Sequence, residues 1–123
     1  MDLEKKYAID REILFKELEV IDLPKIIAAS TKDWQNFSLC AVNDCVVRIG
    51  IIHGDFHWHK HVDEDEFFYV LEGLLHIDIG DSHHTLQPGQ GFVVPRGIEH
   101  RTRAPERTVI LMVEGSGVKP TGD

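Results

Sequence analysis

The stretch Gly54-Asp-Phe-His-Trp-His-Lys-His-Val-Asp-Glu-Asp-Glu66 contains three histidines spaced two residues apart, His57, His59 and His61. Residues two apart on an extended strand point to the same face, with Cα atoms about 7 Å apart. Two imidazoles that lean inward from such positions can reach one ion at about 2.1 Å from each nitrogen. The spacing therefore indicates a metal site, with a solvated strand face as the alternative interpretation.

An acidic run, Asp63 to Glu66, follows the histidines directly. We expect Asp63 and Glu64 to lie in a solvated turn, and Glu66 to face inward where the next apolar strand begins. An inward carboxylate would add a third ligand to the histidine pair, although acidic runs before strands are commonly plain surface.

A second segment, Gly89-Gln-Gly-Phe-Val-Val-Pro-Arg-Gly-Ile-Glu-His100, combines a glycine turn, a short apolar strand and a Pro95-x-Gly97 turn. The turn residues predict a sharp change of chain direction just before His100. Taken alone, His100 is more often a hydrogen-bonded core or surface residue than a ligand. Its combination with the first segment favours a shared site.

Around these segments the sequence is typical of an antiparallel all-β domain, because short β-branched and aromatic runs alternate with glycine and proline turns. The first third is mixed: Asp10 is predicted to cap a short helix, and a second short helix is predicted to begin at Pro24. The strand-like runs are 46–52, 67–71, 74–79, 92–94 and 108–113.

Composition limits the function classes. The 123 residues suit one domain, and 21 acidic against 13 basic residues give a formal net charge of −8. An acidic chain lacks the basic face that phosphate groups or anionic lipids require, so we expect neither a nucleic-acid nor a membrane partner. Two cysteines, Cys40 and Cys45, cannot build a disulfide framework, which favours the cytoplasm.

Together, the two segments resemble the two sequence motifs of the cupin superfamily. The first motif is met by Gly54, His59, His61, Glu66 and Gly73, with four residues after Gly54 where five are usual. The second is met by Gly89, Pro95, Gly97 and His100, with Ala104 in place of its final Asn. More narrowly, the chain resembles small single-domain bacterial cupins, which are often labelled mannose-6-phosphate-isomerase-like.

The resemblance implies a cupin double-stranded β-helix, that is, a jelly-roll barrel, at residues 41–114. We expect a short mixed N-terminal segment, 1–40, to pack on this barrel and residues 115–123 to form an extended tail. The resemblance also implies a homodimer. It further implies that His59, His61, Glu66 and His100 hold one divalent transition metal, which could be Fe, Mn, Ni, Co, Cu or Zn.

Other residues are assigned to the surroundings of that metal. His57 shares the parity of the histidine pair, and we expect it to act as the catalytic base. Phe68 and Val70 share the parity of Glu66 and should line the pocket. Arg48 is a candidate partner for an anionic substrate, with an exposed arginine as the alternative. These features favour a metal-dependent enzyme, of dioxygenase or isomerase type, that binds a small-molecule ligand; a non-catalytic binding or sensing protein is the alternative.

Overall fold

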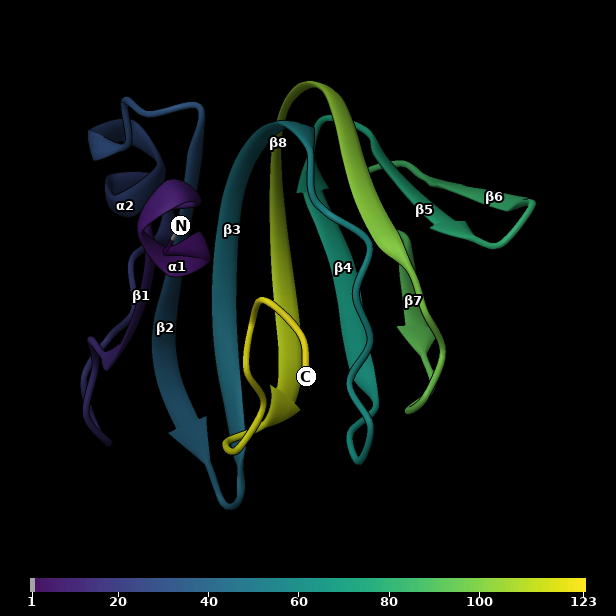
Figure 1. The fold of residues 1–123 in the computed structure, drawn as a ribbon. Helices are drawn as coiled ribbons and strands as arrows, with labels where there is room; N and C mark the ends of the chain where they lie inside the picture. Colours follow the sequence, from purple (N-terminus) through teal and green to yellow (C-terminus); the bar gives the residue numbers. More distant parts are fainter. Residues whose placement is uncertain (1) are drawn as a thin grey trace.

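A computed structural model describes residues 2–123 of the chain. Two short helices and eight strands occur in it, and the strands dominate (Figure 1). The elements are α1 (Leu3–Lys6), β1 (Ile9–Ile13), α2 (Leu23–Ala29), β2 (Trp34–Val42), β3 (Cys45–Asp55), β4 (Glu66–Glu72), β5 (Leu75–Ile79), β6 (Ser82–Leu86), β7 (Gly91–Val94) and β8 (Arg101–Gly115).

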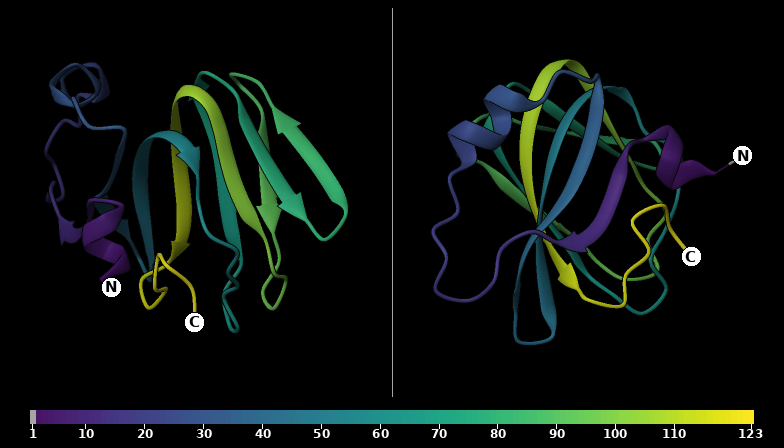
Figure 2. Two further views of the ribbon diagram at one scale, coloured as in Figure 1. Left: turned by 45° about the horizontal axis from the view of Figure 1, so that its top comes forward. Right: turned by 90° about the vertical axis from the view of Figure 1, so that its left-hand side faces the viewer.

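One rolled sheet contains all eight strands, in the order β1-β2-β3-β8-β4-β7, with β5 and β6 branching from β8. The long strand β8 makes the branch possible, since it pairs with β5 near its start and with both β3 and β4 along its later part. The strands curl around a common interior when viewed from the β1 end (Figure 2). This arrangement confirms the predicted all-β fold of cupin jelly-roll type.

Four of the five strand-like runs fall inside β3, β4, β7 and β8, and the run 74–79 begins one residue before β5. The sequence did not reveal β6, because Ser82-His-His-Thr-Leu86 offers only one buried apolar side chain and owes its extended form to pairing with β5. No helix in residues 2–123 has the length and apolar character needed to cross a membrane.

The N-terminal third contains one correct and one incorrect helix prediction. Helix α2 includes Pro24 in its first turn and is capped by Asp22, whose side chain accepts a hydrogen bond from the Lys25 amide at 3.2 Å. Asp10, by contrast, lies in β1, because pairing with β2 supplies backbone hydrogen bonds that local helix signals did not anticipate. The expected boundary between residues 40 and 41 falls inside β2.

Two apolar cores hold the sheet in its rolled form. The interior core packs inward-facing side chains of β3, β4, β5 and β8, including Phe68, Val70 and Ile110. The second core lies outside the sheet, where Leu39, Ile49 and other outward-facing residues contact α2 and the segment before it. The N-terminal segment therefore packs on the barrel through a hydrophobic layer of its own.

Asp78 on β5 is a fully buried carboxylate near the open end of the sheet. It accepts hydrogen bonds from Arg101 Nε at 2.9 Å and from Arg103 Nε and Nη2 at 2.5 and 2.9 Å, and it contacts His83 Nδ1 at 2.7 Å. The hydrogen bonds from Arg103 outweigh the effect of burial and hold the pKa of Asp78 well below its usual value. The group ties β5 to β6 and to the start of β8.

We predict that Asp78→Asn lowers the free energy of unfolding at pH 7 by about 1–3 kcal/mol, because the partly exposed Arg101 and Arg103 lose a buried charged acceptor. The folded pKa lies below the unfolded one, so this stabilisation is complete above about pH 5 and declines as the pH falls below about 4. Urea denaturation of wild type and of Asp78→Asn, each at pH 7 and pH 3, measures the difference in their free energies of unfolding. A difference between the two proteins that grows as the pH is lowered would contradict the prediction.

Candidate metal centre

Backbone pairing brings the two histidine-containing segments together. His59 N donates to His100 O at 2.9 Å, and His100 N donates to His59 O at 2.8 Å, which makes an isolated antiparallel bridge. On the same side, Gly97 N donates to His61 O at 2.7 Å. Residues 56–65 are otherwise irregular, so the regular strand expected there is replaced by a loop that pairs with the segment before β8.

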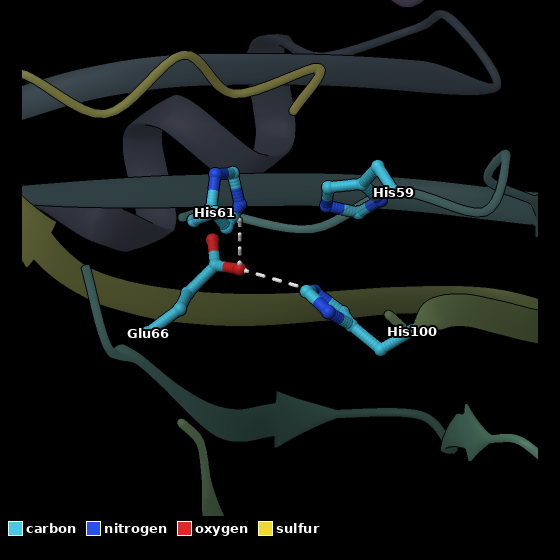
Figure 3. A group of neighbouring side chains, drawn as sticks. All are labelled: His59, His61, Glu66 and His100. Carbon is cyan, nitrogen blue, oxygen red and sulfur yellow. Dashed lines mark ion pairs between the residues drawn. The ribbon is translucent and has the colours of Figure 1, made fainter. Parts of the chain in front are cut away.

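Four side chains converge inside the sheet: His59 and His61 from this loop, Glu66 from the start of β4, and His100 just before β8 (Figure 3). One potential ligand atom from each lies within 4.8 Å of the others. His61, Glu66 and His100 are only 3%, 5% and 1% exposed, and His59 is partly buried. The structure thus brings together the four residues that the cupin resemblance assigned to one site.

Backbone carbonyl groups orient two of the imidazole rings. His59 Nδ1 lies 3.1 Å from His57 O, and His100 Nδ1 lies 2.9 Å from Ile98 O. A carbonyl oxygen can only accept, so each Nδ1 carries the proton and donates it. Each Nε2 of the neutral ring therefore has a free lone pair, which is the form that binds a metal ion.

Several buried polar atoms of the cluster lack a hydrogen-bond partner. Glu66 Oε1 lies 3.3 Å from His61 Nε2 and 3.5 Å from His100 Nε2, and all three atoms are buried without a hydrogen-bond partner among residues 2–123. Two acceptors that face each other out of water repel, unless a proton or a cation lies between them. Three imidazole nitrogens and one carboxylate oxygen are a donor set that suits a divalent transition metal.

The protonation states of His59 and Glu66 are those in which the two side chains can bind a metal ion. Burial, reinforced by nearby His100, lowers the pKa of His59 to about 4, so this ring is neutral at physiological pH. Burial would raise the pKa of Glu66, but the close approach of the His100 and His61 rings outweighs it and holds that pKa well below the usual range. At neutral pH the site therefore offers a carboxylate charge and a neutral imidazole ligand.

A pocket lies beside His59 and Glu66 and encloses ≈ 440 Å³, including the part open to solvent. Phe68 lines it as expected, whereas Val70 is fully buried in the interior core and does not border it. The other apolar lining residues are Trp34, Ile52, Phe56, Ile110 and Met112. The wall is thus mainly aromatic and aliphatic, and its polar side includes His59 and Glu66 of the cluster.

His57 lies at the edge of the cluster, with its ring centroid 5.3 Å from that of His59. Its Nε2 contacts Thr121 O at 2.6 Å, and its Nδ1 is buried without a partner among residues 2–123. Because a carbonyl oxygen can only accept, Nε2 carries the proton and donates it. Nδ1 of the neutral ring is then unprotonated. The ring also packs against Phe56 and Tyr7, and it is not among the described residues that line the pocket.

Residues 116–123 depart from the extended tail expected from the sequence, because they turn back onto the histidine loop. Asp123 N donates to Lys60 O at 2.9 Å, and Val62 N donates to Asp123 Oδ2 at 2.7 Å. Gly122, at φ +97, lies so close to His59 that an added Cβ would meet His59 Cβ at 2.6 Å. Pro120 closes one side of the pocket, so this segment covers the cluster.

Arg48 and Glu114 form a buried pair that the sequence analysis did not anticipate. Arg48 is only 3% exposed, so the alternative interpretation as an exposed arginine is wrong. It is also not among the described residues that line the pocket. Its Nε lies 3.7 Å from Glu114 Oε1. Burial and the neighbouring Glu66 raise the pKa of Glu114, so Glu114 holds a proton that Glu66 lacks. Glu114 follows Met112 by two residues on β8, so both side chains point inward. This alternation is the sequence signal that could have indicated the burial of Glu114.

The fold and the site together define a class of protein: a rolled jelly-roll sheet with three imidazoles and one carboxylate gathered inside it. A family model described as a cupin domain, Cupin_2, matches residues 49–114, more than half of the chain. The chain belongs to the cupin family.

Known proteins resemble the chain over most of its length. It is 46% identical over 80 residues to the uncharacterized protein YdbB of Bacillus subtilis (strain 168), which covers 64% of this chain and 71% of YdbB. A cupin-2 domain containing protein from Shewanella frigidimarina NCIMB 400 superposes with a TM-score of 0.74 at 34% identity, covering 78% of this chain and 94% of that one. Protein NMB1881 from Neisseria meningitidis superposes with a TM-score of 0.70 at 26% identity, covering 79% and 99%.

Proposed function

We propose that the chain binds one divalent transition metal through His59, His61, Glu66 and His100, and that it acts as a metal-dependent enzyme on a small polar metabolite. The observation that carries the metal assignment is that Glu66 Oε1 lies 3.3 Å from His61 Nε2 and 3.5 Å from His100 Nε2, while all three atoms are buried without a hydrogen-bond partner among residues 2–123. Fe, Mn, Ni, Co, Cu and Zn all accept this donor set.

Four protein ligands leave positions open on a five- or six-coordinate ion, which is the arrangement of a catalytic centre rather than a closed structural one. When bound, the ion supplies Lewis-acid polarisation of a carbonyl or enediol, or redox chemistry with oxygen if it is iron. The apolar wall around Trp34 and Phe68 excludes water from the ligand, and the polar side orients the ligand toward the cluster.

We assign the role of general base to His57. Its Nε2 proton is held by Thr121 O, which leaves Nδ1 unprotonated and free to take a proton. Imidazole is the side chain that most often acts as a general base in enzymes, which suits this role. His57 borders the cluster through His59, with the two ring centroids 5.3 Å apart.

For the metal assignment, we predict that His59→Ala and His100→Ala each lose bound metal, because each removes one of the four ligands. Elemental analysis of the purified proteins, at equal protein concentration, measures the metal content. His53→Ala is the matched control, since His53 is an exposed histidine on β3, and it should retain the wild-type content. A full equivalent of metal in either ligand variant would refute the assignment.

A non-catalytic binding or sensing protein is the second candidate, and the cover of residues 116–123 over the cluster favours it, because a closed site retains a ligand. Oxygen uptake and product analysis, after anaerobic loading with Fe(II), separate the two candidates across a panel of small enols and aromatic diols. We predict turnover of at least one compound, and turnover that His57→Gln reduces about 10²-fold or more. Tight binding without turnover of any compound would instead support the binding protein.

We also propose that the chain forms a homodimer through the edge of the sheet at β1. This strand is terminal in the sheet order, and exposed apolar side chains follow it, with Leu18 106% and Val20 88% exposed. An unpaired edge beside an apolar patch favours association with a second copy. Light scattering should give a molar mass of two chains for wild type. The double variant Leu18→Glu/Val20→Glu places charges in the apolar patch and should give the molar mass of one chain. A wild-type monomer at 100 μM would refute the dimer.

The cytoplasm is the compartment we propose for this chemistry. Cys45 is an exposed free thiol and Cys40 a partly buried one, and reducing conditions preserve such groups. Recovery of the chain in the cytosolic fraction of cells that express it checks this assignment, and recovery in an extracellular fraction would refute it.

A further inference from the structure

The histidine loop, residues 59–62, carries two of the four cluster residues but forms no regular strand. On one side, His59 exchanges two backbone hydrogen bonds with His100, and His61 O accepts from Gly97 N at 2.7 Å. Backbone groups of alternate residues in a paired segment point to opposite sides. Lys60 and Val62 therefore need a partner on the other side of the loop.

Asp123 is that partner, because it bonds the residues directly before and after His61. Asp123 N donates to Lys60 O at 2.9 Å, and Asp123 Oδ2 accepts from Val62 N at 2.7 Å. Each distance is that of an ordinary, well-formed hydrogen bond. One residue thus holds both chain neighbours of a cluster histidine.

Gly122 lets Asp123 come this close. Its φ of +97 is a conformation that favours glycine, and an added Cβ would meet His59 Cβ at 2.6 Å and His59 Cγ at 3.2 Å. Gly122 N also donates to Lys119 O at 2.9 Å, which closes the turn before Asp123. A side chain at position 122 would therefore displace either this turn or the His59 side chain.

The segment that carries Gly122 and Asp123 is itself anchored on the barrel. Ser116 N donates to Asp44 O at 2.9 Å in the β2–β3 turn, and Arg11 Nη2 on β1 donates to Val118 O at 3.4 Å. Val118 is 5% exposed, and Pro120 is buried at the wall of the pocket. Because its anchors lie on regular strands and their turns, the segment can hold the histidine loop in a fixed place.

We propose that Gly122 and Asp123 are positioning residues of the metal centre: they clamp the histidine loop so that its two imidazole rings face the other two members of the cluster. The inference rests on the proposed metal site. A ligand-bearing loop is less precise than a strand, and ordering it only when the metal binds would cost conformational entropy. The competing account is that residues 119–123 only pack beside the loop and leave metal binding unchanged.

Three variants test the clamp. Asp123→Ala removes the side-chain acceptor, whereas Asp123→Asn removes the charge and keeps an amide oxygen that can accept from Val62 N. Gly122→Ala adds the Cβ that contacts His59. The asparagine variant matters most, because it separates a hydrogen bond from an effect of charge.

Each alanine variant has a matched control far from the cluster. Asp22→Ala also removes a carboxylate that accepts from a backbone amide, Lys25 N at 3.2 Å, but at the start of α2. Gly89→Ala adds a methyl group at a similar φ of +86, where no atom lies within 4 Å of the new Cβ. The controls share the local cost of each substitution and leave the histidine loop untouched.

The first probe is Co(II), added to metal-free protein whose folding has been checked by circular dichroism. We expect Asp123→Ala and Gly122→Ala to bind Co(II) about 5–10-fold more weakly than wild type, with shifted d–d absorption bands, because ordering the loop then opposes binding. Asp123→Asn and both controls should remain within about twofold of wild type and keep its spectrum.

The second probe needs no metal. The Val62 amide donates to the Asp123 side chain, so its hydrogen exchange in metal-free protein reports the clamp directly. We expect this amide to exchange about 5–10-fold faster in Asp123→Ala than in wild type, and at close to the wild-type rate in Asp123→Asn.

Wild-type Co(II) affinity and spectrum in either Asp123→Ala or Gly122→Ala would overturn the inference. Equal weakening in the matched controls would overturn it too, because a general loss of stability would then explain the effect. It would also fail if Asp123→Asn bound as weakly as Asp123→Ala, or if Val62 exchange were unchanged in Asp123→Ala. Failure of wild type to bind Co(II), Fe(II) or Zn(II) would reject the metal site, and the positioning role with it, whatever the exchange rates.

Discussion

The cluster of three histidines and one glutamate depends on one backbone interaction, the reciprocal pair of hydrogen bonds between His59 and His100. These residues are far apart in the chain, and the loop that carries His59 has no regular strand of its own. The bridge sets the distance between the two segments, and neighbouring carbonyl groups then turn both rings so that each Nε2 faces inward. Small changes in this bridge would move two ligands at once.

The second constraint is electrostatic. Acceptors that face one another out of water destabilise the protein in the absence of a cation, so the cluster is held in place by contacts elsewhere. The interior core, the second core beneath α2 and the Asp78 group supply that rigidity. The buried Arg48–Glu114 pair lies beside the cluster, because Glu114 on β8 pairs in register with Glu66 on β4.

Much of the fold was predictable, because alternating apolar residues and glycine or proline turns are local signals that survive in the finished sheet. Predictions failed where a partner strand overrode local preference. Asp10 carries a helix-capping signal but joins β1, and polar β6 is extended only because β5 pairs with it. Arg48 reads as a surface residue, and its burial depends on acceptors from two other strands. Residues 116–123 contain little apolar sequence, yet their backbone hydrogen bonds return them to the histidine loop.

The sequence by itself determined an antiparallel all-β domain, since side-chain alternation and turn residues are properties of the chain alone, and its resemblance to the cupin motifs named the jelly-roll class and the four residues that converge. Only the tertiary structure decided what surrounds those residues: the proton-bearing Nδ1 atoms, the buried Arg48–Glu114 pair, and the segment that contacts His57 and His59. The physical reason is that each of these depends on a distance between segments far apart in the chain. Such distances arise from packing the whole barrel, and no local pattern encodes them.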